Sequence, residues 1–219
     1  MEQKNSTKTK ILDIAENSFA QFGFDGTSMR DIIIEAKVNN AAIFYHFGSK
    51  QSLFEAVFNR LATPVVEQRL KLLSSCSKTK NTPMLRQILL SYLKPALKTA
   101  FKNNQQRYNF SKIRMQLSQK NHPFMSEMLS NHFTITGEMF LKALSQEFTG
   151  LSIKDIQWRY QTMVGALTFL MGSAESIKSG TFGNKKEAYD PLNMKEAFEH
   201  FLPQMELVFL APPINSKIL

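Results

Sequence analysis

Cysteine is almost absent from this chain, because Cys76 is the single one among 219 residues. One cysteine excludes an intramolecular disulfide framework and is typical of proteins kept in a reducing cytosol. No apolar run approaches the roughly 20 residues that a membrane-spanning helix needs. The polar start MEQKNSTKTK lacks the apolar core of an export signal. We therefore expect a cytoplasmic protein without membrane-spanning segments.

Signatures of catalysis and of metal binding are missing as well. The chain has neither a glycine-rich phosphate loop nor the dinucleotide-binding pattern GxGxxG. Its four histidines, His46, His122, His132 and His200, show no metal-ligand spacing with one another or with Cys76. We expect neither enzymatic activity nor a cofactor or metal site.

Positive charge, in contrast, is abundant, with a formal net charge of +9. An excess of this kind indicates a polyanionic partner. Residues 1–50 carry six basic and six acidic side chains, whereas residues 51–120 carry thirteen basic and two acidic ones. The basic region 51–120 is compatible with steering toward DNA, with a pocket for an anionic ligand, and with a solvated lysine-rich surface.

Helical spacing of apolar residues runs along the chain, and no segment has the pattern of a long strand. We expect helices over residues 8–22, 28–36, 41–47, 50–73, 84–102, 105–119, 121–148, 152–177 and 193–209. Loops are expected at residues 74–82 and 179–190. Pro64 is expected to kink or divide its helix, Pro83 to follow a Thr82 cap, and Pro203 to bend the last helix.

The stretch TSMRDIIIEAKVNNAAIFYHFGSKQSLF predicts two short helices, a tight turn between them and the start of a third helix. Ser28 is a helix-cap residue, with Asp31 at the spacing of a capping box. Gly48 is suited to end the second helix, and Ser49 to cap the third. Two short helices joined in this way form a helix-turn-helix, which lays its second helix in the major groove of DNA.

Within this stretch, the segment that begins AAIFYHFGSKQSLF resembles the recognition helix and the following helix start of the TetR family of transcriptional regulators. The usual pattern there is small-x-Leu/Ile-Tyr-x-His/Tyr-Phe-x-Ser-Lys-x-x-Leu. The resemblance is close over residues 8–60. Residues 60–70 and 158–171 resemble, more loosely, the subgroup of cephalosporin/chloramphenicol-resistance regulators.

The resemblance implies an all-α fold with an N-terminal three-helix helix-turn-helix head and a C-terminal helical domain for ligand binding and dimerisation. We expect the DNA-binding domain at residues 1–50 and the effector-binding and dimerisation domain at residues 51–219. Such a one-component repressor binds a palindromic operator in double-stranded DNA as a homodimer, and a small-molecule effector releases it. An alternative is a helical module that binds an anionic lipid or an acidic partner through the basic region 51–120.

The N-terminal end of a recognition helix meets base edges in the major groove. The candidates for base contact are Asn39, Asn40, Ala41 and Ala42. An asparagine amide can pair with adenine, and an alanine methyl can touch the methyl group of thymine. Capping of the helix is an equal alternative for Asn40.

Contacts to phosphates set the register of a DNA-binding head and carry no sequence information directly. Ser28 suits a phosphate because helix N-termini favour anions, and Arg30 near it is a phosphate or base-edge candidate. By the resemblance, Tyr45, His46 and Lys50 match positions that usually contact phosphates.

Phe44 departs from the family pattern, which most often has a tyrosine after the Leu or Ile. A phenyl ring cannot donate a hydrogen bond to a phosphate. Either Tyr45 takes that role, or Phe44 packs against a sugar or against the core of the head.

The resemblance implies a homodimer joined by the last two long helices. These helices also offer more apolar surface than one core must absorb, and small residues let a second backbone approach closely. The candidates for the interface are Trp158, Gly165, Ala166, Phe169, Gly172, Phe198, Phe201, Leu202, Met205 and Phe209. The alternative is that both helices belong to the core of a single chain.

Methionine and phenylalanine are frequent, at 11 and 18 residues, and methionine adapts to ligands of varied shape. The resemblance places an effector pocket among helices that contain Met84, Phe101, Tyr108, Phe110, Met115, Met128, Phe133 and Met163. Ordinary burial in a core is the alternative for each of them. Arg107, Lys112 and Arg114 are candidates either for contact with an anionic effector or for the protein surface.

Overall fold

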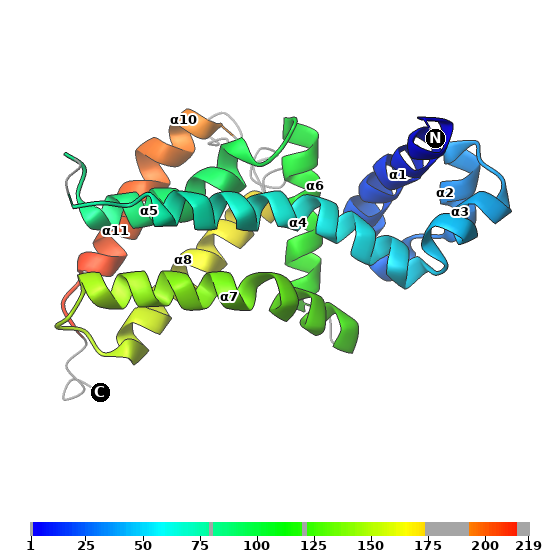
Figure 1. Ribbon diagram of the computed structural model, residues 1–219. Helices are drawn as coiled ribbons and strands as arrows, with labels where there is room; N and C mark the ends of the chain where they lie inside the picture. The colour runs from blue at the N-terminus through cyan, green and yellow to red at the C-terminus, as the bar shows by residue number, and fades with distance from the viewer. Residues whose placement is uncertain (1, 79–80, 120–121, 174–192, 214–219) are drawn as a thin grey trace, which may run out of the picture.

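The computed structural model describes residues 2–78, 81–119, 122–173 and 193–213. Within this described part, the regular elements are all helical (Figure 1). The expected all-α fold with an N-terminal helix-turn-helix is therefore confirmed. None of the described helices is both long enough and apolar enough to cross a membrane.

Three N-terminal helices form the head, and the remaining helices form the body. The head consists of α1 (Glu2–Gly26), α2 (Met29–Ala36) and α3 (Asn40–Phe47). The body consists of α4 (Lys50–Ser74), α5 (Met84–Lys94), α6 (Asn104–Gln119), α7 (Pro123–Glu147), α8 (Ile153–Gly172), α10 (Met194–Glu196) and α11 (Leu202–Leu210). Two π-helical segments, Pro95–Thr99 and Ala197–Phe201, follow α5 and precede α11.

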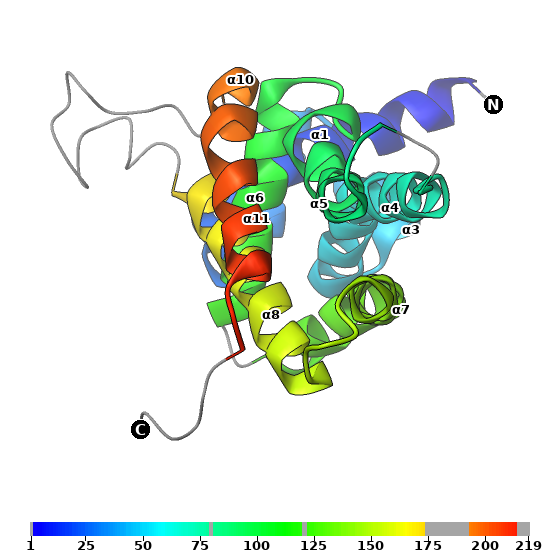
Figure 2. The same ribbon diagram turned by 90° about the vertical axis from the view of Figure 1, so that its left-hand side faces the viewer.

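Helix α4 joins the two parts, because it starts at the head and runs along the body (Figure 1). Helix α6 lies across the end of the body that faces the head, and it packs against α1. Figure 2 shows α8 and α11 on one side of the body and α4 with α5 on the other. The body is therefore connected to the head through more than one helix.

Side-chain caps set the limits of the helices in the helix-turn-helix. The Ser28 hydroxyl accepts a hydrogen bond from the Arg30 amide (3.2 Å), and the Ser49 hydroxyl accepts one from the Ser52 amide (3.1 Å). Gly48 ends α3 with a φ of 70°, a left-handed value that favours glycine. The roles expected for Ser28, Gly48 and Ser49 are confirmed.

Two prolines differ from the expectation. Helix α4 continues through Pro64, so a division of the helix at this residue is wrong. A proline removes one helix hydrogen bond, and the neighbouring Leu61 and Val65 are buried, so packing holds the helix together. Pro83 occupies the N-cap position of α5 itself, so Thr82 is not the cap.

Several helix limits also differ from the expected ones. Helix α1 begins at Glu2 rather than at residue 8. Helix α5 ends at Lys94, because the chain continues from Pro95 as a π-helical turn in which the Ala100 amide donates to the Pro95 carbonyl (3.3 Å). A π-helical turn likewise precedes α11, with Pro203 in its first turn. Residues 174–177 and the expected loop 179–190 lie outside the described residues.

Four phenylalanines fill the junction between the head and the body. Phe19 and Phe24 come from α1, Phe54 from α4 and Phe124 from α7. The ring of Phe54 lies edge-on to that of Phe19 at 4.9 Å and to that of Phe24 at 5.4 Å, and the rings of Phe24 and Phe124 are 5.0 Å apart. Edge-on pairs of this kind add about 0.5–1.5 kcal/mol each beyond burial.

A polar network lies beside this aromatic junction. Arg60 of α4 pairs with Asp13 (2.6 Å) and with the buried Glu16, both on α1. The Asn109 amide of α6 donates to the other carboxylate oxygen of Glu16 (3.0 Å) and to the Asn17 side chain (2.8 Å). Helix α1 is thereby tied to α4 and α6 at once.

We predict that Phe54→Ala lowers the free energy of unfolding by about 3–5 kcal/mol, because it removes the central ring of the junction and leaves a cavity. Phe22→Ala is the matched control, since Phe22 is 58% exposed and its loss should change stability by less than about 0.5 kcal/mol. Denaturation in urea, followed by helical circular dichroism, measures both. Equal stability of the two variants would contradict the assigned role of the cluster.

Candidate nucleic-acid interface and ligand cavity

One face of α3 is turned outward from the head. Ile43 and Phe47 are buried in the head, whereas Phe44 is 47% exposed and Tyr45 is 71% exposed. Asn40 and Ala41 are exposed one turn earlier, as helical periodicity requires. The ring of Phe44 is therefore outside the core of the head, which removes one of the alternatives that its sequence position left open.

The cap of α3 is Asn39 rather than Asn40. The Asn39 side-chain oxygen accepts a hydrogen bond from the Ala42 amide (2.8 Å), which leaves Asn40 as the first helical residue. Among the remaining α3 candidates, Ala42 and His46 are half-buried, and the His46 ring packs against that of Tyr45 at 5.2 Å.

The phosphate candidates outside α3 lie at the starts of α2 and α4. Arg30 is exposed beside the Ser28 cap. The Lys50 ammonium, in contrast, donates to the Asp25 carbonyl (3.3 Å) and lies 4.7 Å from the centre of the Phe24 ring. Lys50 thus contacts the head itself, a role that its sequence position did not indicate.

The interface candidates fall into two groups. Trp158, Gly165 and Phe169 are exposed and form a stripe along α8, with Trp158 at 69% and Phe169 at 51% exposure. Leu207 and Leu210 of α11 are also exposed, at 68% and 62%. These two leucines were not among the candidates, although Leu207 lies within the expected last helix and Leu210 directly follows it.

The other interface candidates are covered by the chain itself. Phe201, Leu202, Met205 and Phe209 are buried in the body, and Ala166 and Phe198 are half-buried. Gly172 faces Met115, whose sulfur would lie 2.8 Å from an added Cβ. The predicted interface role is wrong for the buried residues, because they belong to the core of the chain. Residue type alone does not tell which side of an apolar helix is covered by its own chain.

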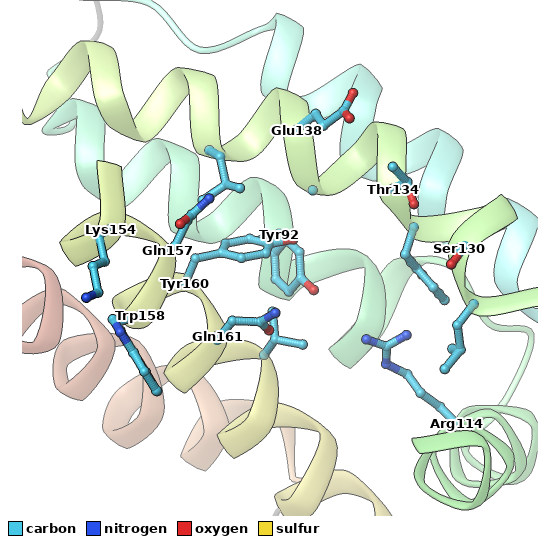
Figure 3. A pocket seen from close by; sticks show the side chains of 15 residues that line it. Tyr92, Arg114, Ser130, Thr134, Glu138, Lys154, Gln157, Trp158, Tyr160 and Gln161 are labelled. Carbon is cyan, nitrogen blue, oxygen red and sulfur yellow. The ribbon is translucent and has the colours of Figure 1, made fainter. Parts of the chain in front are cut away.

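A cavity of about 630 Å³ opens between α7 and α8, with α5 and α6 behind it (Figure 3). Its apolar and aromatic lining consists of Tyr92, Leu129, Phe133, Leu141, Trp158, Tyr160 and Val164. Its polar lining consists of Arg114, Ser130, Thr134, Glu138, Lys154, Gln157 and Gln161. Of the eight pocket candidates from the sequence, Phe133 lines this cavity.

The other pocket candidates lie elsewhere in the body. Met128, Met163 and Phe110 are buried, and Phe101 packs against Phe110 with ring centres 5.3 Å apart. Met115 faces Gly172, Tyr108 lies beneath the Lys112 ammonium, and Met84 lines a separate surface hollow of about 360 Å³. These seven candidates do not line the cavity between α7 and α8, because their helices turn other faces toward it.

Arg69 and Arg114 contact aromatic residues of the cavity lining, and Arg114 also lines the cavity itself. The Arg69 guanidinium is 3.6 Å from the centre of the Tyr92 ring, and its Nε donates to the Tyr92 carbonyl (2.9 Å). The Arg114 guanidinium lies 4.2 Å from the centre of the Phe133 ring. Its Nη1 is buried and has no hydrogen-bond partner within the described part of the chain.

Burial changes the proton affinity of these groups. Burial lowers the pKa of the Arg114 guanidinium from its ordinary value, and the nearby charge of Arg69 acts in the same direction. Arginine nevertheless stays protonated in proteins. Burial raises the pKa of the Tyr160 phenol well above its ordinary value, and the neighbouring Tyr92 adds to this rise. The Tyr160 phenol therefore supplies no negative charge to Arg114 near neutral pH.

Two regulators match the head: the IcaR negative regulator of the biofilm operon icaADBC from Staphylococcus aureus (strain Newman), 42% identical over 48 residues, and the regulator Mb3439c from Mycobacterium bovis, 45% identical over 53 residues. These matches cover 22% and 24% of this chain and 26% and 28% of those proteins. The alignment thus spans about a quarter of the length of the curated relatives.

Solved structures match most of the chain. A TetR-like transcriptional regulator from Rhodococcus sp. RHA1 superposes with a TM-score of 0.58 at 18% identity, over 93% of each chain. PfmR, a TetR family transcriptional regulator from Thermus thermophilus, superposes with a TM-score of 0.56 at 15% identity, over 92% of this chain and 97% of that one. At such identities the likeness shows a shared fold alone.

Two family models match the chain directly. The model of bacterial regulatory proteins of the tetR family matches residues 11–57, and the model of the tetracyclin repressor-like C-terminal domain matches residues 91–204. The first covers the head and the start of α4, and the second covers more than half of the chain. The protein belongs to the TetR family, whose members are DNA-binding transcriptional regulators and not enzymes.

Proposed function

We propose that this regulator is a homodimeric repressor that binds a palindromic operator in the cytoplasm and is released by a small molecule bound in the cavity of the body. The observation that carries the proposal is the outward face of α3, whose first turn carries an exposed amide and an exposed methyl group. Repression is supported by the head, which is similar to that of IcaR, a negative regulator. The division into residues 1–50 and 51–219 belongs to this proposal, with α4 running from one part into the other.

In the proposed complex, Asn40 and Ala41 meet base edges, and the cap Asn39 holds the first turn of α3 in place. Tyr45 donates to a phosphate through its hydroxyl, and Phe44 packs against a sugar. Their exposure on one face of α3 supports this division of roles. A second backbone contact comes from the start of α2, where amides and a positive dipole favour anions.

The capped end of α2 carries Ser28 and the exposed Arg30, which we assign to phosphate. Lys50 fixes the path of the chain into α4 through its contacts with Asp25 and Phe24. His46 orients Tyr45 by packing against its ring. None of these contacts selects a base, so sequence preference rests on the first turn of α3.

The dimer surface in this proposal is the stripe of Trp158, Gly165 and Phe169 on α8, together with Leu207 and Leu210 of α11. An added Cβ at Gly165 meets no atom of the described residues within 4 Å, which supports the approach of a second backbone at this position. Two heads on one operator supply the affinity and specificity that one short recognition helix lacks.

Two helices of the cavity wall also touch the head, which supports a ligand-controlled spacing of the heads. From α6, the Gln116 amide donates to the Ala20 carbonyl (3.2 Å). From α7, Phe124 packs on Phe24, and the His122 ring nitrogen lies 3.4 Å from the Asp25 carboxylate. A ligand that favours one separation of α6 and α7 shifts the position of α1, and with it the affinity for the operator.

The subgroup of cephalosporin/chloramphenicol-resistance regulators is not part of this proposal. The regulators and structures named above give that loose resemblance no support, and this chain is 18% and 15% identical to the two solved structures. The effector is therefore inferred from the cavity of this chain.

Selection of bound sequences from random double-stranded DNA tests the proposed function. We expect an enriched palindrome whose half-sites are separated by the spacing of the two heads. Affinity should fall steeply with salt, because basic side chains release counterions from the phosphates. Enrichment of single, unpaired half-sites, or no enrichment at all, would overturn the proposal.

We predict that Asn40→Ala costs about 1–3 kcal/mol of operator binding and relaxes the base preference at one position of each half-site. Tyr45→Phe should instead weaken binding several-fold for all sequences alike, since it removes a phosphate contact. Gln21→Ala, an exposed change on α1, is the control and should bind as the wild type does. Fluorescence anisotropy with the selected operator and with single-base variants distinguishes the two effects. Unchanged affinity and unchanged preference in both variants would contradict the assigned roles.

We predict that Gly165→Glu and Phe169→Glu convert a dimer into monomers at micromolar concentration, because each buries an unpaired carboxylate in the proposed interface. An added Cβ at Gly165 meets none of the described atoms within 4 Å, and Phe169 is 51% exposed, so helical circular dichroism should stay unchanged. Ile135→Glu is the matched control, since Ile135 is 64% exposed on α7, away from this surface. Analytical ultracentrifugation gives the outcome, and a dimer in both α8 variants would show that the interface lies elsewhere.

A further inference from the structure

Arginines of the basic region 51–120 usually have polar partners within the chain. Arg60 pairs with Asp13 and Glu16, and Arg86 forms a two-point ion pair with Glu206, with both distances at 2.7 Å. Such pairing is expected, because a charge removed from water is costly unless it is paired or hydrogen-bonded.

Arg114 is the exception at the cavity wall. No carboxylate of the described residues pairs with it, and its Nη1 is buried without a hydrogen-bond partner. Its charged neighbour is a second cation, Arg69, whose Nε already donates to the Tyr92 carbonyl. The Phe133 ring face offers only a weak attraction to the guanidinium.

The unmatched charge of Arg114 lies at the wall of the cavity. Figure 3 shows its guanidinium reaching from α6 into the cavity, toward the rings of Tyr92 and Tyr160. Glu138, the acidic side chain in the lining, is exposed on α7 and lies apart from Arg114 in the same view. The cavity thus combines a cationic inner end with aromatic walls and an open mouth.

We propose that the effector of this regulator is an aromatic carboxylate, with its carboxylate bound by Arg114 and its ring held between the Tyr92–Tyr160 pair and Phe133. This inference rests on the proposed function, in which the cavity of the body is the effector site. A guanidinium matches a carboxylate with two parallel hydrogen bonds, and a carboxylate in the cavity supplies the negative charge that Arg114 lacks among the described residues. The edge-on pair of Tyr92 and Tyr160, with ring centres 5.6 Å apart, forms a wall suited to a flat ring.

The carboxylate also explains how the ligand acts on the body. Arg114 belongs to α6 and Phe133 to α7, and both helices contact the head. A ligand anchored to the first and stacked on the second fixes the separation of the two helices. A neutral aromatic compound lacks the anchor, so it should bind more weakly and leave the helices free to separate.

The test uses 2-naphthoate and its neutral counterpart 2-naphthamide, titrated calorimetrically into the full-length protein without DNA. We expect the wild type to bind the carboxylate at least tenfold more tightly than the amide. Arg114→Met, which keeps an unbranched apolar stem but removes the guanidinium, should lose at least tenfold in affinity for the carboxylate and less than twofold for the amide. Arg114→Lys keeps the positive charge but lacks the two parallel N–H donors of the guanidinium. This variant should bind the carboxylate with intermediate affinity.

Lys112→Met is the matched control, because it removes the same charge from the same helix at a residue outside the cavity lining. It should bind the carboxylate as the wild type does. A thermal melt without ligand adds a second measurement: Arg114→Met should melt at or above the wild-type temperature, since it removes an unmatched buried charge.

Three results would overturn the inference. The first is equal affinity of the wild type for the carboxylate and the amide, and the second is no binding of either compound. The third is an equal loss of affinity for both compounds in Arg114→Met. Operator selection is carried out separately and without the ligand. Failure of the naphthoate test with an intact operator therefore rejects the ligand class alone, whereas absence of DNA binding rejects the proposed function.

Discussion

The buried carboxylate of Glu16 is the interaction on which the arrangement of head and body depends. It is 5% exposed, and a charge in that position is costly unless partners surround it. Arg60 of α4 and Asn109 of α6 supply those partners, so α1 packs where both helices can reach it. Four phenylalanines complete the junction with apolar area. The position of the head is therefore tied to the positions of α4, α6 and α7.

The same cost of buried charge organises the body. The basic region 51–120 suggested steering, an anion pocket or a solvated surface. Its arginines contribute to internal contacts, as with Arg60 at the head and Arg86 with Glu206, while lysines such as Lys94, Lys98 and Lys102 remain exposed. Arg114, in contrast to Arg60 and Arg86, pairs with no carboxylate of the described residues and lines a cavity. An anion pocket and a lysine surface are thus compatible, because different residues of the region serve each.

Helix starts and ends that depend on residues close together in the chain could be predicted from the sequence. Ser28, Gly48 and Ser49 end and begin helices through their own side chains or backbone freedom, so the helix-turn-helix could be found without tertiary information. The family pattern from Ile43 onward lies on these same elements. The likeness of the head to known regulators and of the body to a family model agrees with that local evidence.

Packing between distant segments decided the rest. The apolar residues of the last helices are alike in composition, yet Phe209 is buried whereas Leu207 and Leu210 are exposed, because contact with α5 and α8 covers one side of α11. The cavity likewise takes Tyr92, Arg114 and Tyr160 from three helices, and the sequence offers no spacing that joins them. The sequence by itself determined the helices and the DNA-binding unit, since these depend on neighbouring residues. The tertiary structure decided which faces are buried and where an unmatched charge lies, since burial depends on residues far apart in the chain.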